Sequence, residues 1–289
     1  MKRLSEPGVN DEQILNEIAG RAALSSHPQL QNSLGLVVGQ YLNYCHVKGD
    51  VSLLEAPIGM DVKLATAMRG HYNNAINGLE FIRKMRESMS PDVCPMCGSF
   101  GTSQLDHVAP KEEYPEYAFF SWNLVPACDC NTKKGTRYRG DGIGERVLHP
   151  YYDDILRDRL AYLRFYGDVD APDIEVRVVD RYSNHPAVKY HVDTIIKKTR
   201  IKTWAFRQWA NLQRAPGNLI SGLRYSSGNL TADVLERFMH DELSAADENY
   251  QTPNNWTSML MYGIVSNPTL VEHLTNTANR LRQHAGSVI

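Results

Sequence analysis

The chain has 289 residues, a formal net charge of −2 and 42% hydrophobic residues, which is enough for one large domain or two small ones. The near-neutral charge excludes no class of partner, because nucleic-acid binding depends on where positive charge gathers. No apolar run follows the basic residues at the start, and no later stretch has the apolar length of a membrane span. We therefore expect a soluble, cytoplasmic protein without a membrane partner.

Apolar residues repeat at helical spacing in the N-terminal region, residues 1–89. One series runs from Leu30 to Cys45, and a second runs from Leu64 to Ile82. Each series predicts a helix whose apolar stripe packs in the core. We expect residues 1–89 to be mainly helical.

Residues 90–150 differ, because short apolar pieces alternate with Pro and Gly and four of the five cysteines fall here. Cys94 and Cys97 form a C-x-x-C pair, and Cys128 and Cys130 form a shorter C-x-C pair. Cysteines gathered in this way are typical of a metal site in a reducing compartment, whereas secreted proteins spread theirs in a disulfide framework. Four thiolates at tetrahedral positions suit a closed, structural Zn²⁺ site, which we predict here.

The C-terminal region, residues 151–289, is expected to be mainly helical. Alternation in residues 173–180 breaks it once and predicts a single strand or extended arm. The last helix should begin at Asn267 and Pro268, an N-cap and first-turn pair. Between 189 and 214, seven Lys or Arg residues stand against one acidic residue, which gives the predicted helix a charge of +6.

Four further polar residues lie between and just after the cysteine pairs, in LDHVAPKEEYPEYAFFSWNLVPACDCNTKKG: Asp106, His107, Asn123 and Asn131. Their order resembles the HNH endonuclease family, which has the ββα-metal fold, and in particular its four-cysteine zinc branch, as in phage endonuclease VII. The resemblance covers about residues 91–136, with a weaker echo in RVLHPYYDD. It implies an α+β protein in which a zinc-stapled ββα-metal (HNH) centre, residues 90–150, is embedded in a mainly helical chain.

The resemblance also implies a role for each of these residues. His107 would be the general base, and Asn123 would hold the loop that carries it. Asp106 and Asn131 would bind the catalytic Mg²⁺ or Mn²⁺, for which oxygen atoms are suitable ligands. The expected function is a metal-dependent HNH endonuclease that hydrolyses DNA phosphodiester bonds and leaves 5′-phosphate and 3′-hydroxyl ends. Its expected setting is phage defence or a mobile element, with an ATPase or sensor protein as a further partner.

Basic residues near the motif and in the second basic segment could contact DNA phosphates, since charge-assisted bonds to phosphate set register without reading sequence. An ordinary solvated basic face is the alternative for each group. The candidates are Lys111, Lys133, Lys134 and Arg137 around the motif, and Lys197, Lys198 and Arg200 in the second segment.

Two other functions stay open. A zinc-dependent nucleic-acid-binding module without catalysis would keep the cysteines and the basic residues, and a partner-binding protein would use its helices. Neither needs Asp106, His107 and Asn131 together, so their joint presence favours an enzyme. A double-strand break made with one active site per chain would favour a homodimer.

Overall fold

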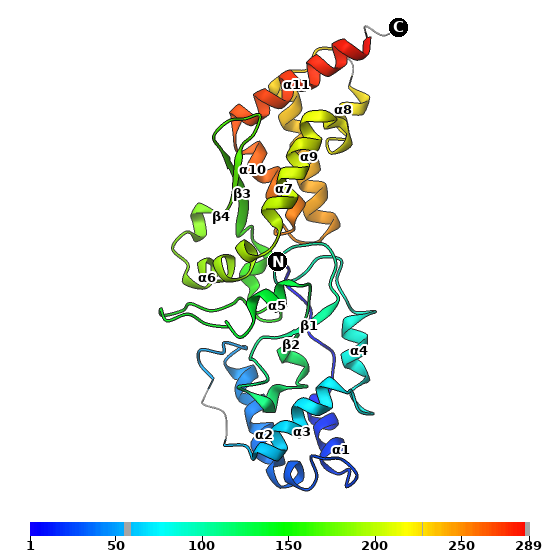
Figure 1. The fold of residues 1–289 in the computed structure, drawn as a ribbon, viewed down its shortest axis with the longest axis vertical. Helices are drawn as coiled ribbons and strands as arrows, with labels where there is room; N and C mark the ends of the chain where they lie inside the picture. The colour runs from blue at the N-terminus through cyan, green and yellow to red at the C-terminus, as the bar shows by residue number, and fades with distance from the viewer. Residues whose placement is uncertain (55–58, 227, 287–289) are drawn as a thin grey trace.

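The computed structural model describes residues 1–54, 59–226 and 228–286 and shows an elongated molecule (Figure 1). Its buried apolar residues form two clusters, one drawn mainly from residues 15–151 and the other mainly from residues 148–278. Each cluster is the core of one unit. The N-terminal unit lies at the bottom of Figure 1 and the C-terminal unit at the top.

Helices and a short hairpin make up the N-terminal unit. Its elements are α1 (Asp11–Ala19), α2 (Gln29–His46), α3 (Val62–Asn73), α4 (Glu80–Arg86), β1 (Gln104–His107), the 3-10 turns η1 (Pro115–Tyr117) and η2 (Ser121–Asn123), β2 (Leu124–Ala127) and α5 (Cys130–Lys134). Strands β1 and β2 are antiparallel, with Asp106 opposite Val125. Asn10 caps α1, because its side chain accepts a hydrogen bond from the backbone N–H of Gln13 (3.1 Å). The hairpin followed by α5 therefore has the order strand, strand, helix.

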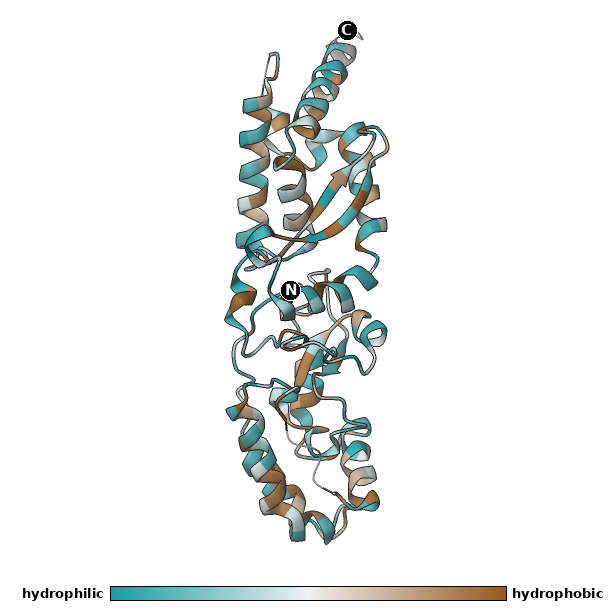
Figure 2. Ribbon diagram, turned by 90° about the vertical axis from the view of Figure 1, so that its left-hand side faces the viewer, coloured by the Kyte–Doolittle hydropathy of each residue, from teal (hydrophilic) through white to brown (hydrophobic). Residues whose placement is uncertain are grey.

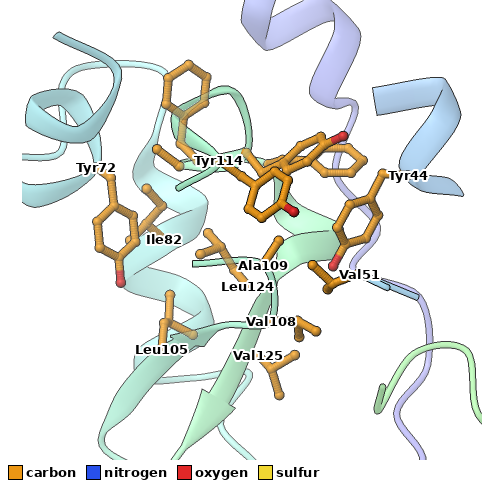
Figure 3. Close-up of a cluster of buried hydrophobic side chains, with 14 of the residues drawn as sticks. Tyr44, Val51, Tyr72, Ile82, Leu105, Val108, Ala109, Tyr114, Leu124 and Val125 are labelled. Atoms are coloured by element: carbon orange, nitrogen blue, oxygen red, sulfur yellow. The ribbon is translucent and has the colours of Figure 1, made fainter. Parts of the chain in front are cut away.

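The N-terminal helices and the hairpin share one core. Figure 3 shows Tyr44 of α2, Tyr72 of α3 and Ile82 of α4 around Leu105 and Leu124 of the hairpin, and all of them are buried. The boundary predicted after residue 89 therefore falls inside a single packed unit. Because these side chains pack together, helices α2 to α4 fix the position of the hairpin.

The helix predicted from Leu64 to Ile82 is wrong in its middle. Helix α3 ends at Asn73, and α4 begins at Glu80. Between them Gly78 has a φ of +97°, a left-handed conformation that glycine adopts without steric cost. The apolar spacing continues across this break because both helices face the same core.

The C-terminal unit packs helices against a second two-stranded sheet. Its elements are η3 (Asp154–Arg157), β3 (Ala161–Tyr166), β4 (Asp173–Val178), η4 (Asp180–Tyr182), α6 (Pro186–Thr194), η5 (Ile196–Lys198), α7 (Ile201–Arg214), η6 (Pro216–Asn218), α8 (Gly222–Tyr225), α9 (Ala232–Asn249), α10 (Trp256–Val265) and α11 (Pro268–Gly286). Helix α10 contacts β3, and a Cβ atom at Gly263 would lie only 1.7 Å from the Leu163 carbonyl oxygen. This close approach requires glycine.

One strand of this sheet was not predicted. The segment at 173–180 contains the expected strand, β4, but it pairs antiparallel with β3, which lies in a stretch predicted to be helical. Buried and more exposed residues alternate along β3, and Figure 2 shows hydrophobic and hydrophilic residues alternating along these strands. The period of two in AYLRFY was the missed signal. The last helix, α11, begins at Pro268 as expected, and Asn267 caps it by accepting from the backbone N–H of Thr269 (3.2 Å).

None of the helices within the described ranges combines the length and apolarity that crossing a bilayer requires.

Candidate functional site

The four cysteines of the predicted metal site lie together. Sγ of Cys94 is 3.7 Å from Sγ of Cys130, and Sγ of Cys97 is 3.4 Å from Sγ of Cys128. All four sulfurs lie within 4.8 Å of one another. Four sulfurs bound at about 2.3 Å to one zinc ion would be about 3.8 Å apart. This set, called the cysteine cluster below, therefore has the spacing to bind a metal such as zinc.

Hydrogen bonds around the sulfurs favour the thiolate form at one ligand. The Ser99 hydroxyl (3.2 Å) and the backbone N–H of Cys130 (3.3 Å) both donate to Sγ of Cys128. Bonds from the Cys130, Cys94 and Cys97 thiols and from Ser99 hold the pKa of the Cys128 thiol well below its ordinary value. Thiolates are the form that binds metal.

The loop after Cys94 is fastened by the C-terminal unit. Trp256 donates from its indole Nε1 to the Cys97 carbonyl (3.0 Å) and from its backbone N–H to the Gly98 carbonyl (3.0 Å). His191 donates from Nε2 to the Met96 carbonyl (2.6 Å), because its Nδ1 already accepts from a backbone N–H. The cysteine cluster therefore lies where the two units meet.

A cavity of about 360 Å³ lies beside the hairpin. Asp106 and His107 reach it from β1, and Asn131 reaches it from α5. These residues are up to 25 positions apart in the sequence, yet the fold brings them to one place. The rest of the lining is Tyr72, Leu105, Pro110, Lys111, Glu112, Thr132, Gly135 and Thr136.

His107 is held as a neutral imidazole with a defined tautomer. Its Nε2 lies 2.9 Å from the Ala118 carbonyl oxygen, which can only accept, so Nε2 carries the proton and Nδ1 keeps a lone pair. Burial lowers the pKa of His107 to about 4 against the opposing effect of the Ala118 bond. The Tyr72 ring packs edge-on against the imidazole at 4.4 Å between centroids. Such a side chain can accept a proton at neutral pH.

Asp106 is buried and has one oxygen without a partner. Its Oδ1 lies 3.0 Å from Nζ of Lys134, and the two side chains are only 3% and 1% exposed. Among the described residues, none gives a hydrogen bond to Oδ2. Burial raises the pKa of Asp106, although Lys134 acts in the opposite direction. An orphaned carboxylate oxygen at the cavity is a suitable ligand for a hard cation.

Asn131 is placed to supply a second oxygen ligand. Its Nδ2 donates to the Leu105 carbonyl (3.4 Å), so Oδ1 is the atom of this side chain that could bind a cation. One carboxylate and one amide oxygen fit Mg²⁺ or Mn²⁺, which keep their other positions for water and phosphate.

Asn123 is fully buried and fastens the loop that follows His107. Its Oδ1 accepts from the backbone N–H of Ala109 (2.7 Å), and its Nδ2 donates to the Ala109 carbonyl (2.9 Å) and the Tyr117 carbonyl (3.2 Å). Asn123 thus bonds both the N–H and the carbonyl group of Ala109 and holds the loop in place. This geometry is the one that a positioning role requires.

A chain of hydrogen bonds continues from Asn123 into other parts of the fold. Tyr44 donates to Oδ1 of Asn123 (3.0 Å). His149 accepts from the backbone N–H of Tyr151 at Nδ1 (3.2 Å), so its Nε2 donates to the Tyr44 hydroxyl (3.0 Å). His149 is completely buried, and burial lowers its pKa to about 3. Residues 146–154, the segment with the weaker resemblance to the family, therefore lie against the hairpin.

The predicted DNA contacts differ in their surroundings. The predicted contact of Lys134 with DNA is wrong, because its ammonium is buried against Asp106 and the His107 carbonyl (3.0 Å) and faces no solvent. Lys133 is paired with Asp129 (2.6 Å) but remains partly exposed, and Lys111 is paired with Glu112 (2.6 Å) at the cavity. Arg137 is exposed.

The second basic segment folds back to the first. It is not one helix, since η5 and Thr199 separate α6 from α7. Turn η5 contacts α5, so the exposed Lys197, Lys198 and Arg200 lie near the helix that carries Asn131. We call these three residues the basic turn. Lys197 also forms an ion pair with Asp193 (2.7 Å).

Among known proteins, the chain is similar to protein ea31 of Escherichia phage lambda, with 27% identity over 187 residues. The match covers 62% of this chain and 62% of that protein, so the chain spans less than two thirds of this relative. No family model and no solved structure matches the chain.

The sequence analysis missed two features of this site, the contact of Tyr44 with Asn123 and the pairing of Lys134 with Asp106. Tyr44 lies 79 positions from Asn123 and has no motif around it. The second had a signal, because Lys134 follows Asn131 by three positions, which places both on one face of a helix. Lys133 lies on another face of the same turn.

Proposed function

We propose that this chain is a metal-dependent endonuclease of the HNH type that hydrolyses phosphodiester bonds in DNA. The observation that carries the proposal is the shared cavity of Asp106, His107 and Asn131. A zinc-dependent nucleic-acid-binding module without catalysis does not need a neutral imidazole beside an unpartnered carboxylate oxygen. Both features have a use in hydrolysis.

Each residue has a definite task in this reaction. His107 accepts a proton at Nδ1 from the attacking water while its Nε2–H stays on the Ala118 carbonyl. Asn123 keeps the following loop, and with it the imidazole, in place. Asp106 and Asn131 would hold the divalent cation. Mg²⁺ or Mn²⁺, when bound, supplies the positive charge that stabilises the phosphate as negative charge develops on it.

The cysteine cluster has a structural role in this proposal. With Zn²⁺ bound by all four sulfurs, no position is left open for catalysis. The ion would secure the start of α5 at Cys130, and α5 carries Asn131 at the cavity and Lys134 against Asp106. We propose the ββα-metal fold for residues 90–150 on the same grounds.

DNA is the proposed partner. The basic turn and α5 together offer positive side chains beside the helix that lines the cavity, and such contacts give sequence-independent affinity. Similarity to a phage lambda protein agrees with a mobile-element setting. We also propose that the protein forms a homodimer and that an ATPase or sensor protein is a further partner.

A plasmid-nicking assay tests the proposed function. The protein is incubated with supercoiled plasmid and Mg²⁺ or Mn²⁺, and His107→Ala is compared with wild type and with His46→Ala, a substitution at an exposed histidine. We expect cleavage by wild type and His46→Ala, and a loss of about 10²- to 10⁴-fold in His107→Ala, because the general base is gone.

Other outcomes separate the competing functions. A His107→Ala protein that cuts at the wild-type rate would contradict the assignment of the base. A wild-type protein that binds DNA in a zinc-dependent way but never nicks it would favour the non-catalytic binding module. Binding to neither DNA nor RNA would leave a partner-binding protein as the better explanation.

A further inference from the structure

Lys134 is a charged side chain that is almost completely buried. Its side chain is 1% exposed, and Nζ lies 3.0 Å from Oδ1 of Asp106 and 3.0 Å from the His107 carbonyl oxygen. Lysine is almost never fully buried unless it is paired. Here the partner is the same carboxylate that the proposed function assigns to the catalytic cation.

Charge is balanced at the cavity before any divalent cation arrives. The single negative charge of Asp106 meets the positive charge of Lys134, and Lys111 and Glu112 form a second neutral pair (2.6 Å). Protein sites for Mg²⁺ usually combine one or two carboxylates with the phosphates of the substrate. This cavity has no net negative charge with which to attract such a cation by itself.

We propose that Lys134 makes binding of the divalent cation at Asp106 conditional on the phosphodiester. The inference rests on the proposed function and adds an order of assembly to it. A cation bound at Oδ2 of Asp106 would share that carboxylate with the Lys134 ammonium, and the two positive charges would repel in a poorly solvated site. The phosphate of DNA brings negative charge to the same place, so it offsets that repulsion and strengthens cation binding.

Lys134 is held in this position by its place in the fold. Helix α5 begins at Cys130 and ends at Lys134, and Gly135 follows with a φ of +59°. The side chain bonds at once to the carboxylate and to the backbone of β1. A purely structural lysine would contribute to stability alone, whereas the proposed role predicts a change in cation affinity when its charge is removed.

The first experiment measures Mn²⁺ binding without DNA, by electron paramagnetic resonance of free Mn²⁺ at pH 8. Wild type is compared with Lys134→Gln and with Lys133→Gln, which removes the same charge from the neighbouring, partly exposed residue. We expect Lys134→Gln to bind Mn²⁺ at least about tenfold more tightly than wild type. Lys133→Gln should resemble wild type. Folded Lys134→Gln that binds Mn²⁺ no more tightly overturns the inference.

A second measurement needs no substitution at Lys134, which matters if that variant does not fold. In His107→Ala, DNA affinity is measured by fluorescence anisotropy with and without Mn²⁺. Because coupling is reciprocal, Mn²⁺ should tighten DNA binding at least about tenfold. Adding Asp106→Asn should remove this effect. Equal DNA affinity with and without Mn²⁺ overturns the inference.

Failure of the inference and failure of the proposed function give different results. If wild type nicks plasmid and Asp106→Asn does not, yet Mn²⁺ and DNA bind independently, only the coupling is wrong. If wild type never nicks plasmid and Asp106→Asn leaves Mn²⁺ binding unchanged, the proposed function itself is wrong.

Discussion

The cysteine cluster and the cavity are joined by the same short helix, but they are built in opposite ways. At the cluster, every cysteine sulfur has a sulfur neighbour, and the C-terminal unit fastens the loop through Trp256 and His191. At the cavity, one oxygen of Asp106 has no partner within the described residues. The first arrangement is closed and suits stability, whereas the second is incomplete and suits binding.

This difference explains how one helix can serve both. Helix α5 starts in the cluster at Cys130, presents Asn131 to the cavity and places Lys134 against Asp106. A buried, incompletely satisfied carboxylate costs free energy, so the surrounding structure must hold it in place. The cluster, with its metal bound, would supply that rigidity. The comparison therefore predicts large stability effects at the cluster and mainly functional effects at the cavity.

The largest expected effect is the loss of one cysteine ligand. Cys94→Ser should lose its zinc and more than about 5 kcal/mol of stability, since metal binding contributes directly to folding. Zinc content and thermal unfolding measure this. Cys45→Ser is the matched control, because Cys45 lies outside the cluster and its sulfur accepts a hydrogen bond from the Tyr152 hydroxyl (3.5 Å). Equal stability of Cys94→Ser and Cys45→Ser would remove the structural role of the cluster.

The next effect compares two asparagines. Asn123→Ala should cost about 3 kcal/mol in the free energy of unfolding, because buried groups of Ala109, Tyr117 and Tyr44 each lose a hydrogen bond. Asn131→Ala should cost about 1 kcal/mol or less but reduce cation affinity roughly 10- to 100-fold. Urea unfolding and Mn²⁺ titration with bound DNA separate the two. The reverse pattern would exchange the roles that we assign.

A smaller effect concerns acid. Burial lowers the pKa of His191 to about 4, so the native state binds no proton there between pH 7 and 5, while the unfolded chain does. This group therefore stabilises the protein above its unfolded pKa of about 6.5, and the contribution is lost as pH falls toward 4. His191→Gln should be destabilising at pH 7, and that penalty should shrink by about 1.5 kcal/mol at pH 5.

The effect of His191 must be measured against a variant, because the protonation of other buried groups changes stability in the opposite direction as pH falls. Burial raises the pKa of Glu116 to about 7 and of Asp11 to about 6. Each of these carboxyls stabilises the native state as pH falls, whereas His107 and His149, whose pKa values are also lowered by burial, act in the same direction as His191. The wild-type curve therefore sums several groups, and only a variant isolates His191. Glu116→Gln should raise stability at pH 8 and lose this advantage at pH 5. A penalty in His191→Gln that does not change with pH would contradict the assigned protonation.

The smallest effect on stability is expected at the basic turn. Changing Lys197, Lys198 and Arg200 to Glu should alter the free energy of unfolding by less than about 0.5 kcal/mol, because all three are exposed. DNA affinity should fall about tenfold or more for every sequence, and its dependence on salt should weaken. Arg237→Glu on α9 is the control for charge. Unchanged DNA affinity at low salt would remove the basic turn from the interface.

The local sequence determined the parts of the site that depend on spacing. Cys94, Cys97, Cys128 and Cys130 indicated a metal site from their pairs alone, because short spacings force sulfurs of each pair close together. Periodicity predicted α2, and the Asn267–Pro268 pair predicted the start of α11. These features involve neighbours along the chain, whose geometry the backbone fixes.

The tertiary structure alone decided what surrounds the reactive groups. Packing buried Lys134 and left Lys133 at the surface, although the two are adjacent and chemically identical. It also brought Tyr44 to Asn123 and the basic turn to α5 across long stretches of sequence. The burial and partners of a charged group depend on which distant segments fold over it, and no local spacing records that.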